Sequence, residues 1–145
     1  MEVTWHYPPP EPGTIQFEKR GILVKESCGD ADISIVRQNG ADGNISVKWK
    51  TIDRTAINKK DYQGGEGVIE FNHGEVLQLP TASSQIVSIF FPPQTHRTLH
   101  IPIVNDMEFE KDENFEIELF DAEGGAKIGK VNRTAVTITN DDGNH

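Results

Sequence analysis

The chain has a single cysteine, Cys28, among its 145 residues, so it can form no intrachain disulfide and has no set of thiols for zinc. It also has no apolar run near the roughly 18 residues that span a bilayer. The first residues lack the basic and apolar regions of a signal peptide. We therefore expect no direct membrane insertion of this fragment, and we expect a piece of a larger protein whose targeting signals lie elsewhere.

Basic residues are scarce, with 14 Lys and Arg against 23 Asp and Glu, which gives a formal net charge of −9. A field of this sign repels phosphate backbones and anionic lipid surfaces, and it concentrates cations near the protein. We therefore exclude nucleic acid as a partner and expect a cationic one.

Motifs of catalysis are missing as well. The sequence has no nucleophile elbow and no phosphate-cradling glycine motif, and Cys28 has no histidine near it in the sequence. His96 and His100 alternate with the apolar Leu99 and Ile101, which turns both imidazoles outward on a strand. We expect a protein that is not an enzyme.

Apolar residues recur with a period of two from Gly13 onward, and no segment shows a sustained helical repeat. Turn-forming pairs such as Asn39-Gly40 and Gly124-Gly125 separate these segments. The pattern predicts an all-β fold, an antiparallel immunoglobulin-like β-sandwich of about seven strands. The expected core residues are Ile15, Phe17, Ile33, Ile35, Val47, Trp49, Leu99, Ile101, Ile103, Phe115, Ile117, Leu119, Val136 and Ile138.

The domain is expected to span residues 13–142, after a proline-rich leader or linker at 1–12 and before a short tail at 143–145. Residues 64–85 are expected to be an insertion. Val68 to Phe71 and Val76 to Leu79, joined by a turn at Asn72 to Gly74, predict an extra hairpin within it.

Acidic residues gather at four places, each near the end of an expected strand: Glu26, Asp61, the stretch from Asn105 to Glu113, and Asn140 to Asp142. If consecutive strands run antiparallel, the strand ending at Lys25, the Trp49 strand, the Leu99 strand and the Val136 strand all point the same way. This count assigns a descending strand to Ser88–Phe91. It predicts that all four acidic places meet at one end of the fold.

Carboxylates crowded in this way require a cation. Two carboxylates about 4 Å apart repel by roughly 4 kcal/mol at an effective dielectric constant near 20. Ca²⁺ takes six to eight oxygen ligands, whereas Mg²⁺ demands a tighter octahedron, and no His or Cys lies within the acidic stretches to favour a transition metal. The alternative interpretation is that these loops are merely solvated surface.

Seven segments, taken in order, resemble a Calx-β domain, a family of β-sandwiches that includes the Ca²⁺ sensors in the cytoplasmic loop of sodium/calcium exchangers and repeats in extracellular adhesion and matrix proteins. They are Gly13-Thr-Ile-Gln-Phe17, Val24-Lys-Glu-Ser-Cys-Gly29, Asp61-Tyr62, Phe91-Pro-Pro-Gln-Thr95, Ile101-Pro-Ile-Val-Asn-Asp106, Phe109-Glu-Lys-Asp-Glu-Asn-Phe115 and Val136-Thr-Ile-Thr-Asn-Asp-Asp142. The resemblance implies Ca²⁺ as the bound ion and a set of ligands. These are Glu26, Asp61, Asp106, Glu110, Glu113, Asp141 and Asp142, with the backbone carbonyl of Glu108 as a further ligand.

The exchanger sensors imply a Ca²⁺-binding regulatory module in the cytoplasmic domain of a membrane protein, next to a neighbouring domain of the same chain. A repeat in an extracellular adhesion or matrix protein is the alternative, and the triplets Asn44-Ile-Ser46 and Asn132-Arg-Thr134 are glycan acceptors consistent with it. A third interpretation is a metal-free interaction module, because Asn105, Met107 and Asn140 replace acidic residues of the strongest Ca²⁺ binders in the family.

Overall fold

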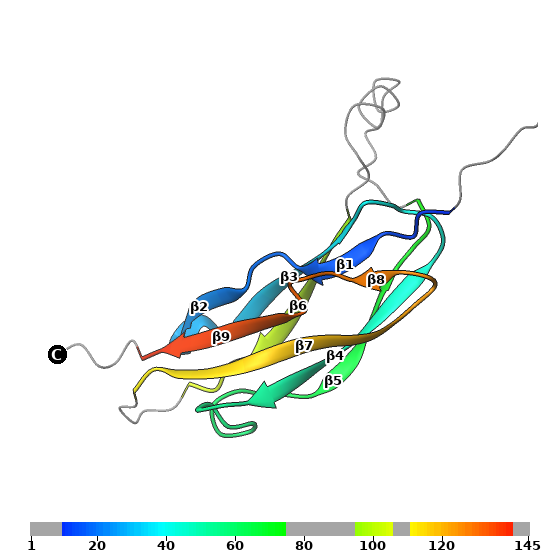
Figure 1. Ribbon diagram of the computed structural model, residues 1–145. Coiled ribbons are helices and arrows are strands. Elements are labelled where there is room, and N and C mark those ends of the chain that lie inside the picture. The colour runs from blue at the N-terminus through cyan, green and yellow to red at the C-terminus, as the bar shows by residue number, and fades with distance from the viewer. Residues whose placement is uncertain (1–9, 75–94, 106–110, 141–145) are drawn as a thin grey trace, which may run out of the picture.

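The chain folds into two β-sheets that pack face to face around a hydrophobic core (Figure 1). The computed structural model describes residues 10–74, 95–105 and 111–140. No helix long and apolar enough to cross a membrane occurs in these three ranges. They contain, in order, β1 (Thr14–Phe17), β2 (Gly21–Lys25), the 3-10 turn η1 (Glu26–Cys28), β3 (Asp30–Gln38), β4 (Ile45–Asp53), β5 (Glu66–Phe71), β6 (Thr95–Pro102), β7 (Glu113–Glu123), β8 (Lys127–Ile128) and β9 (Arg133–Thr139).

One sheet has four strands in the order β6-β3-β1-β8, and the other has five in the order β2-β9-β7-β4-β5. Most neighbours are antiparallel, whereas β1 runs parallel to β8 and β2 runs parallel to β9. The expected all-β sandwich is confirmed. Its described strands number nine, because the expected strand that ends at Lys25 divides into β1 and β2, β8 lies in an expected turn and β5 lies in the expected insertion, whereas one of the seven expected strands lies outside the described residues.

The chain crosses from one sheet to the other between β1 and β2 and again between β8 and β9. The chain leaves the four-stranded sheet after Phe17 and joins the five-stranded sheet at Gly21. Main-chain hydrogen bonds from Glu18 N to Ser34 O (3.0 Å) and from Ala135 N to Arg20 O (3.0 Å) hold the two sides of the crossing. Between β8 and β9 the chain crosses in the same direction. β1 therefore pairs with β8 in the four-stranded sheet, and β2 pairs with β9 in the five-stranded sheet, as at other corners where strands switch sheets.

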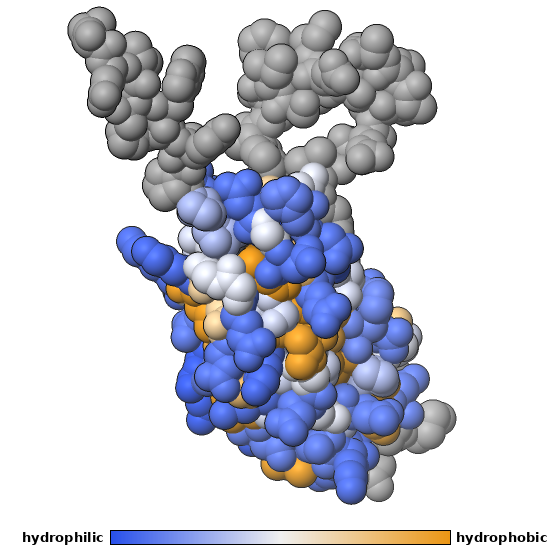
Figure 2. Space-filling model, turned by 90° about the vertical axis from the view of Figure 1, so that its right-hand side faces the viewer, coloured by the Kyte–Doolittle hydropathy of each residue, from blue (hydrophilic) through white to orange (hydrophobic). Residues whose placement is uncertain are grey.

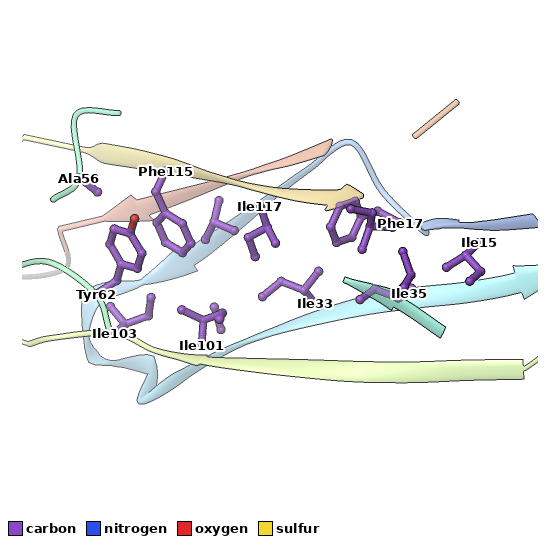
Figure 3. Close-up of a cluster of buried hydrophobic side chains, with 14 of the residues drawn as sticks. Ile15, Phe17, Ile33, Ile35, Ala56, Tyr62, Ile101, Ile103, Phe115 and Ile117 are labelled. Atoms are coloured by element: carbon purple, nitrogen blue, oxygen red, sulfur yellow. The ribbon is translucent and has the colours of Figure 1, made fainter. Parts of the chain in front are cut away.

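The core consists of side chains that point inward from both sheets, at alternate positions along each strand (Figure 3). Every core residue expected from the sequence is buried except Trp49 and Leu99, which are half-buried and pack against the core. The Trp49 indole covers Gly67 on the neighbouring strand, where an added Cβ would lie 2.8 Å from Trp49 Nε1.

Arg37 closes the core at one end, although it carries a charge and is only 1% exposed. It follows Ile33 and Ile35 in the inward register of β3. Its guanidinium donates to the main-chain oxygens of Pro12 (2.8 Å), Asn72 (3.2 Å), Asp42 (3.1 Å) and Gly43 (2.9 Å). One arginine thus joins three chain segments at this end of the sandwich, which lies on the right in Figure 1.

The expected strand from Val68 to Phe71 is confirmed, and the expectation that residues 64–85 are an insertion stays a prediction. Glu66–Phe71 is β5, the outer strand of the five-stranded sheet, which pairs antiparallel with β4 from Ile45↔Phe71 to Lys50↔Glu66. Because it is antiparallel to β4, β5 returns the chain toward the Arg37 end, and its last residue, Phe71, is fully buried in the core. The expected partner strand Val76 to Leu79 and the expected strand Ser88–Phe91 lie outside the described residues.

The described surface is mainly hydrophilic. Figure 2, which views the molecule from the right-hand side of Figure 1, shows hydrophobic residues only as small separate patches. Leu23, Ile57, Val68 and Val104 are the large hydrophobic residues that the described part of the chain exposes. Isolated exposed apolar residues of this kind are usual for globular domains.

Candidate functional site

Strand directions bring several of the expected acidic places to one end of the sandwich. β2, β4, β6 and β9 run toward this end, and β3, β5 and β7 run away from it. We call it the acidic end. It contains η1, the loop 54–65, residues 103–105, the start of β7 and Asn140, and it lies on the left in Figure 1.

Glu26 opens the η1 turn and is only 5% exposed. The turn ends at Gly29 with φ +85°, a left-handed conformation that a side chain would strain. The Gly29 carbonyl accepts a hydrogen bond from Ile103 N at 2.8 Å. Ile103, which directly follows β6, therefore fixes the turn that carries Glu26.

Asp61 lies in the loop between β4 and β5 and is 6% exposed. Its Oδ2 accepts from Ile57 N at 2.8 Å, and its main-chain oxygen accepts from Val104 N at 3.0 Å. Its Oδ1 has no hydrogen-bond partner within the described part of the chain. Because Ile103 and Val104 are consecutive, one short segment holds both carboxylate-bearing loops in place.

Glu26, Asp61 and Glu113 line one small pocket at the acidic end, together with Lys111 and Asn140. Three of the predicted site residues therefore come together. In the three described ranges no three His, Cys, Asp or Glu side chains are placed closely enough to hold a metal ion. The predicted ligands Asp106, Glu108, Glu110, Asp141 and Asp142 lie outside the described residues.

The donor set of this pocket fits a hard cation. Its polar groups are three carboxylates, the Asn140 amide and the Lys111 ammonium, and two of the carboxylates are more than nine-tenths buried. Burying a charged carboxylate is costly unless an opposite charge or hydrogen bonds compensate it. Oxygen ligands of this type suit Ca²⁺ better than zinc or copper, which favour imidazole and thiolate ligands.

The structure adds two residues that the sequence reasoning did not assign to the site, Asp53 and Tyr62. Tyr62 is fully buried, and its ring stacks on Phe115 with centroids 3.7 Å apart and planes at 5° (Figure 3). Its hydroxyl donates to Asp53. Burial, and secondly this hydrogen bond, raise the pKa of Tyr62 far above its ordinary value. The sequence signal was present, since Tyr62 directly follows Asp61 and Asp53 ends a strand.

The residues set aside as non-catalytic are placed as expected. His96 and His100 are exposed on β6, and His100 Nδ1 lies 2.6 Å from Asp32 Oδ1 on the surface of the sheet. Cys28 is exposed as well.

Comparison with known proteins gives matches along most of the chain. A sequence profile of the Calx-beta domain matches residues 10–88 and 81–142. Human sodium/calcium exchanger 2 is 32% identical over 108 residues, 74% of this chain and 10% of the exchanger. Human extracellular matrix organizing protein FRAS1 is 31% identical over 126 residues, 87% of this chain and 3% of that protein.

A solved structure agrees with these relatives. The crystal structure of the apo-form Calx CBD1 domain superposes with a TM-score of 0.71 at 27% identity, over 89% of this chain and 97% of that one. The chain spans a tenth or less of the length of the exchanger and of FRAS1. It belongs to the Calx-β domain family.

Proposed function

We propose that the chain is a Ca²⁺-binding regulatory module of a larger protein, with its ion site in the pocket at the acidic end. The observation that carries this proposal is the convergence of Glu26 and Asp61, two nearly buried carboxylates from different loops, with Glu113 on one pocket. A divalent cation would compensate charges that otherwise repel each other in a partly desolvated place.

A regulatory role would follow from the path of the chain beside the pocket. Ca²⁺ would cancel the repulsion between the loops that carry its ligands and so make their arrangement rigid. β9 ends at Thr139, and Asn140 lies on the same pocket, so the chain leaves the described fold beside the ion. Ordering at the site would therefore pass directly to a neighbouring domain of the same chain.

The first candidate for the parent protein is a sodium/calcium exchanger, in whose cytoplasmic loop such a module would act as a sensor. The identity to sodium/calcium exchanger 2 supports this choice. The proposal concerns a binding module and includes no catalytic residue.

The second candidate is a repeat in an extracellular matrix protein, where bound Ca²⁺ would stiffen a row of domains. Two observations are consistent with it. FRAS1 is 31% identical over 87% of the chain, and both acceptor asparagines, Asn44 and Asn132, are exposed. N-linked glycan on either asparagine of the natural protein would support this candidate over the first.

Calorimetric titration with Ca²⁺ tests the ion site. We expect heat of binding for the wild type and affinity at least about tenfold weaker for Asp61→Asn and Glu113→Gln, because each removes a charged ligand. Glu123→Gln is the matched control, since it removes one charge from an exposed position at the far end of β7. A folded wild type without Ca²⁺ heat at millimolar concentration would leave a metal-free interaction module as the function.

A further inference from the structure

The loop that carries Asp61 is held in shape by bonds that do not involve the proposed ion. Thr51 Oγ1 accepts from Gly65 N (3.0 Å), and Asn58 Oδ1 accepts from Gly64 N (2.7 Å). Lys59 N donates to the main-chain oxygen of Tyr62 (2.7 Å). The loop is therefore a defined structure of its own, and its shape determines where the Asp61 carboxylate lies.

Asp53 is the central acceptor of this loop. Its Oδ1 accepts from Asn58 N at 2.9 Å and also from the hydroxyl of Tyr62. Asp53 is exposed and is not among the residues that line the pocket. It therefore contacts the site only through other residues, and it ties the end of β4 to the residue that directly follows Asp61.

Tyr62 extends this connection to β7. Its ring stacks on Phe115, two residues after Glu113, and its backbone forms a bridge with Ile103. Asp61 and Glu113, which line the same pocket, are thus joined through the Tyr62–Phe115 stack (Figure 3). Any displacement of Tyr62 would change the separation of these two carboxylates.

We propose that Asp53 and Tyr62 are a pair of positioning residues for the ion site, which hold the Asp61 carboxylate on the pocket that it shares with Glu113 and Glu26 through the hydrogen bond between them. The proposal rests on the Ca²⁺-binding function above. Like-charged side chains move apart when they are free to do so, so a loop without this bond would place Asp61 farther from its partners before the ion arrives. Groups that orient metal ligands typically change metal affinity by 10- to 100-fold when they are removed.

The test compares Ca²⁺ affinities by calorimetry in folded variants. Asp53→Ala and Tyr62→Phe should each weaken Ca²⁺ binding about tenfold, the lower limit for groups that orient ligands. Asp53→Asn keeps an acceptor oxygen for the Tyr62 hydroxyl while losing the same charge as Asp53→Ala. It should therefore bind within about threefold of the wild type, because the retained bond and not the charge is what matters. The double variant Asp53→Ala with Tyr62→Phe should bind like Asp53→Ala alone, since Asp53→Ala already removes the bond that Tyr62→Phe would break.

A control separates positioning from general loss of stability. Ile35→Val removes one buried methylene from β3 and should lower the melting temperature without changing Ca²⁺ affinity. Equal weakening by Asp53→Asn and Asp53→Ala would show that Asp53 acts by its charge and would overturn the proposal. So would wild-type affinity in both Asp53→Ala and Tyr62→Phe. Absence of binding in the wild type itself would instead refute the ion site.

Discussion

Thr134 lies inside the sandwich on β9 and is only 1% exposed, yet its hydroxyl has no hydrogen-bond partner in the described part of the structure. A buried hydroxyl without a partner costs about 1–3 kcal/mol. Thr134→Val replaces the hydroxyl by a methyl group of nearly the same shape. We expect the variant to raise the free energy of unfolding by about 1 kcal/mol, measured by urea denaturation.

Thr134→Ser provides the control, because it keeps the hydroxyl and removes the methyl group. It should be less stable than the wild type by about 1 kcal/mol, the cost of a lost buried methyl. If Thr134→Val were instead less stable than the wild type, the hydroxyl would have to bind a partner such as a water in the small cavity that it lines with Ile22 and Ile33.

For the strand β5, two substitutions test how firmly residues 66–71 are packed in the sheet. Phe71 points into the core and is fully buried, whereas Val68 on the same strand is 56% exposed. Phe71→Ala should therefore lower the free energy of unfolding by about 3–5 kcal/mol. Val68→Ala should change it by less than about 1 kcal/mol, because little apolar area is lost from the interior.

Chemical denaturation followed by tryptophan fluorescence measures both variants, since Trp49 packs beside β5. Similar small losses in the two variants would mean that the strand is only loosely attached to the sheet.

Alternation along the sequence predicted the core but not the crossing between sheets. Ile15 and Phe17 occupy odd positions, whereas Ile22 and Val24, which also pack against the core, occupy even ones. This change of phase at residues 18–21 was the available signal for the division of β1 from β2. The expected strand directions were confirmed in the described elements, although most consecutive strands lie in different sheets and β4 and β5 are the one consecutive pair that are hydrogen-bonded neighbours there.

Contacts between residues far apart in the sequence could not be predicted from the alternation of apolar residues. Arg37 follows Ile33 and Ile35 in an inward register, but its acceptors include backbone carbonyls of residues 12, 42, 43 and 72, which no local pattern identifies. The bond between Asp53 and Tyr62 likewise depends on the shape of a whole loop. Of the site residues predicted from the sequence, Glu26, Asp61 and Glu113 line one pocket, whereas the bond between Asp53 and Tyr62 became visible only in three dimensions.

For the whole molecule, the distribution of charge matters more than the individual ion pairs. On the outer face of the five-stranded sheet, Arg133 pairs with Glu118, and Arg54 pairs with Glu116. Exposed pairs of this kind contribute about 0–1 kcal/mol each. The 23 acidic residues exceed the 14 Lys and Arg by nine, so repulsion within the chain should outweigh the attraction of its surface pairs.

Salt should consequently stabilise the Ca²⁺-free protein. Raising the KCl concentration from about 0.01 M to 0.1 M shortens the Debye length from about 30 Å to about 10 Å and screens the repulsion between carboxylates. We expect the melting temperature of the Ca²⁺-free form to rise, and that of the Ca²⁺-saturated form to rise less, because the bound ion already compensates the charges at the acidic end. The ion should itself add about 2.7 kcal/mol of stability at a hundredfold excess over its dissociation constant. Scanning calorimetry at both salt concentrations, with and without Ca²⁺, measures the difference between the two salt effects. Equal salt effects in the two forms would show that the carboxylates of the acidic end are not the main source of repulsion.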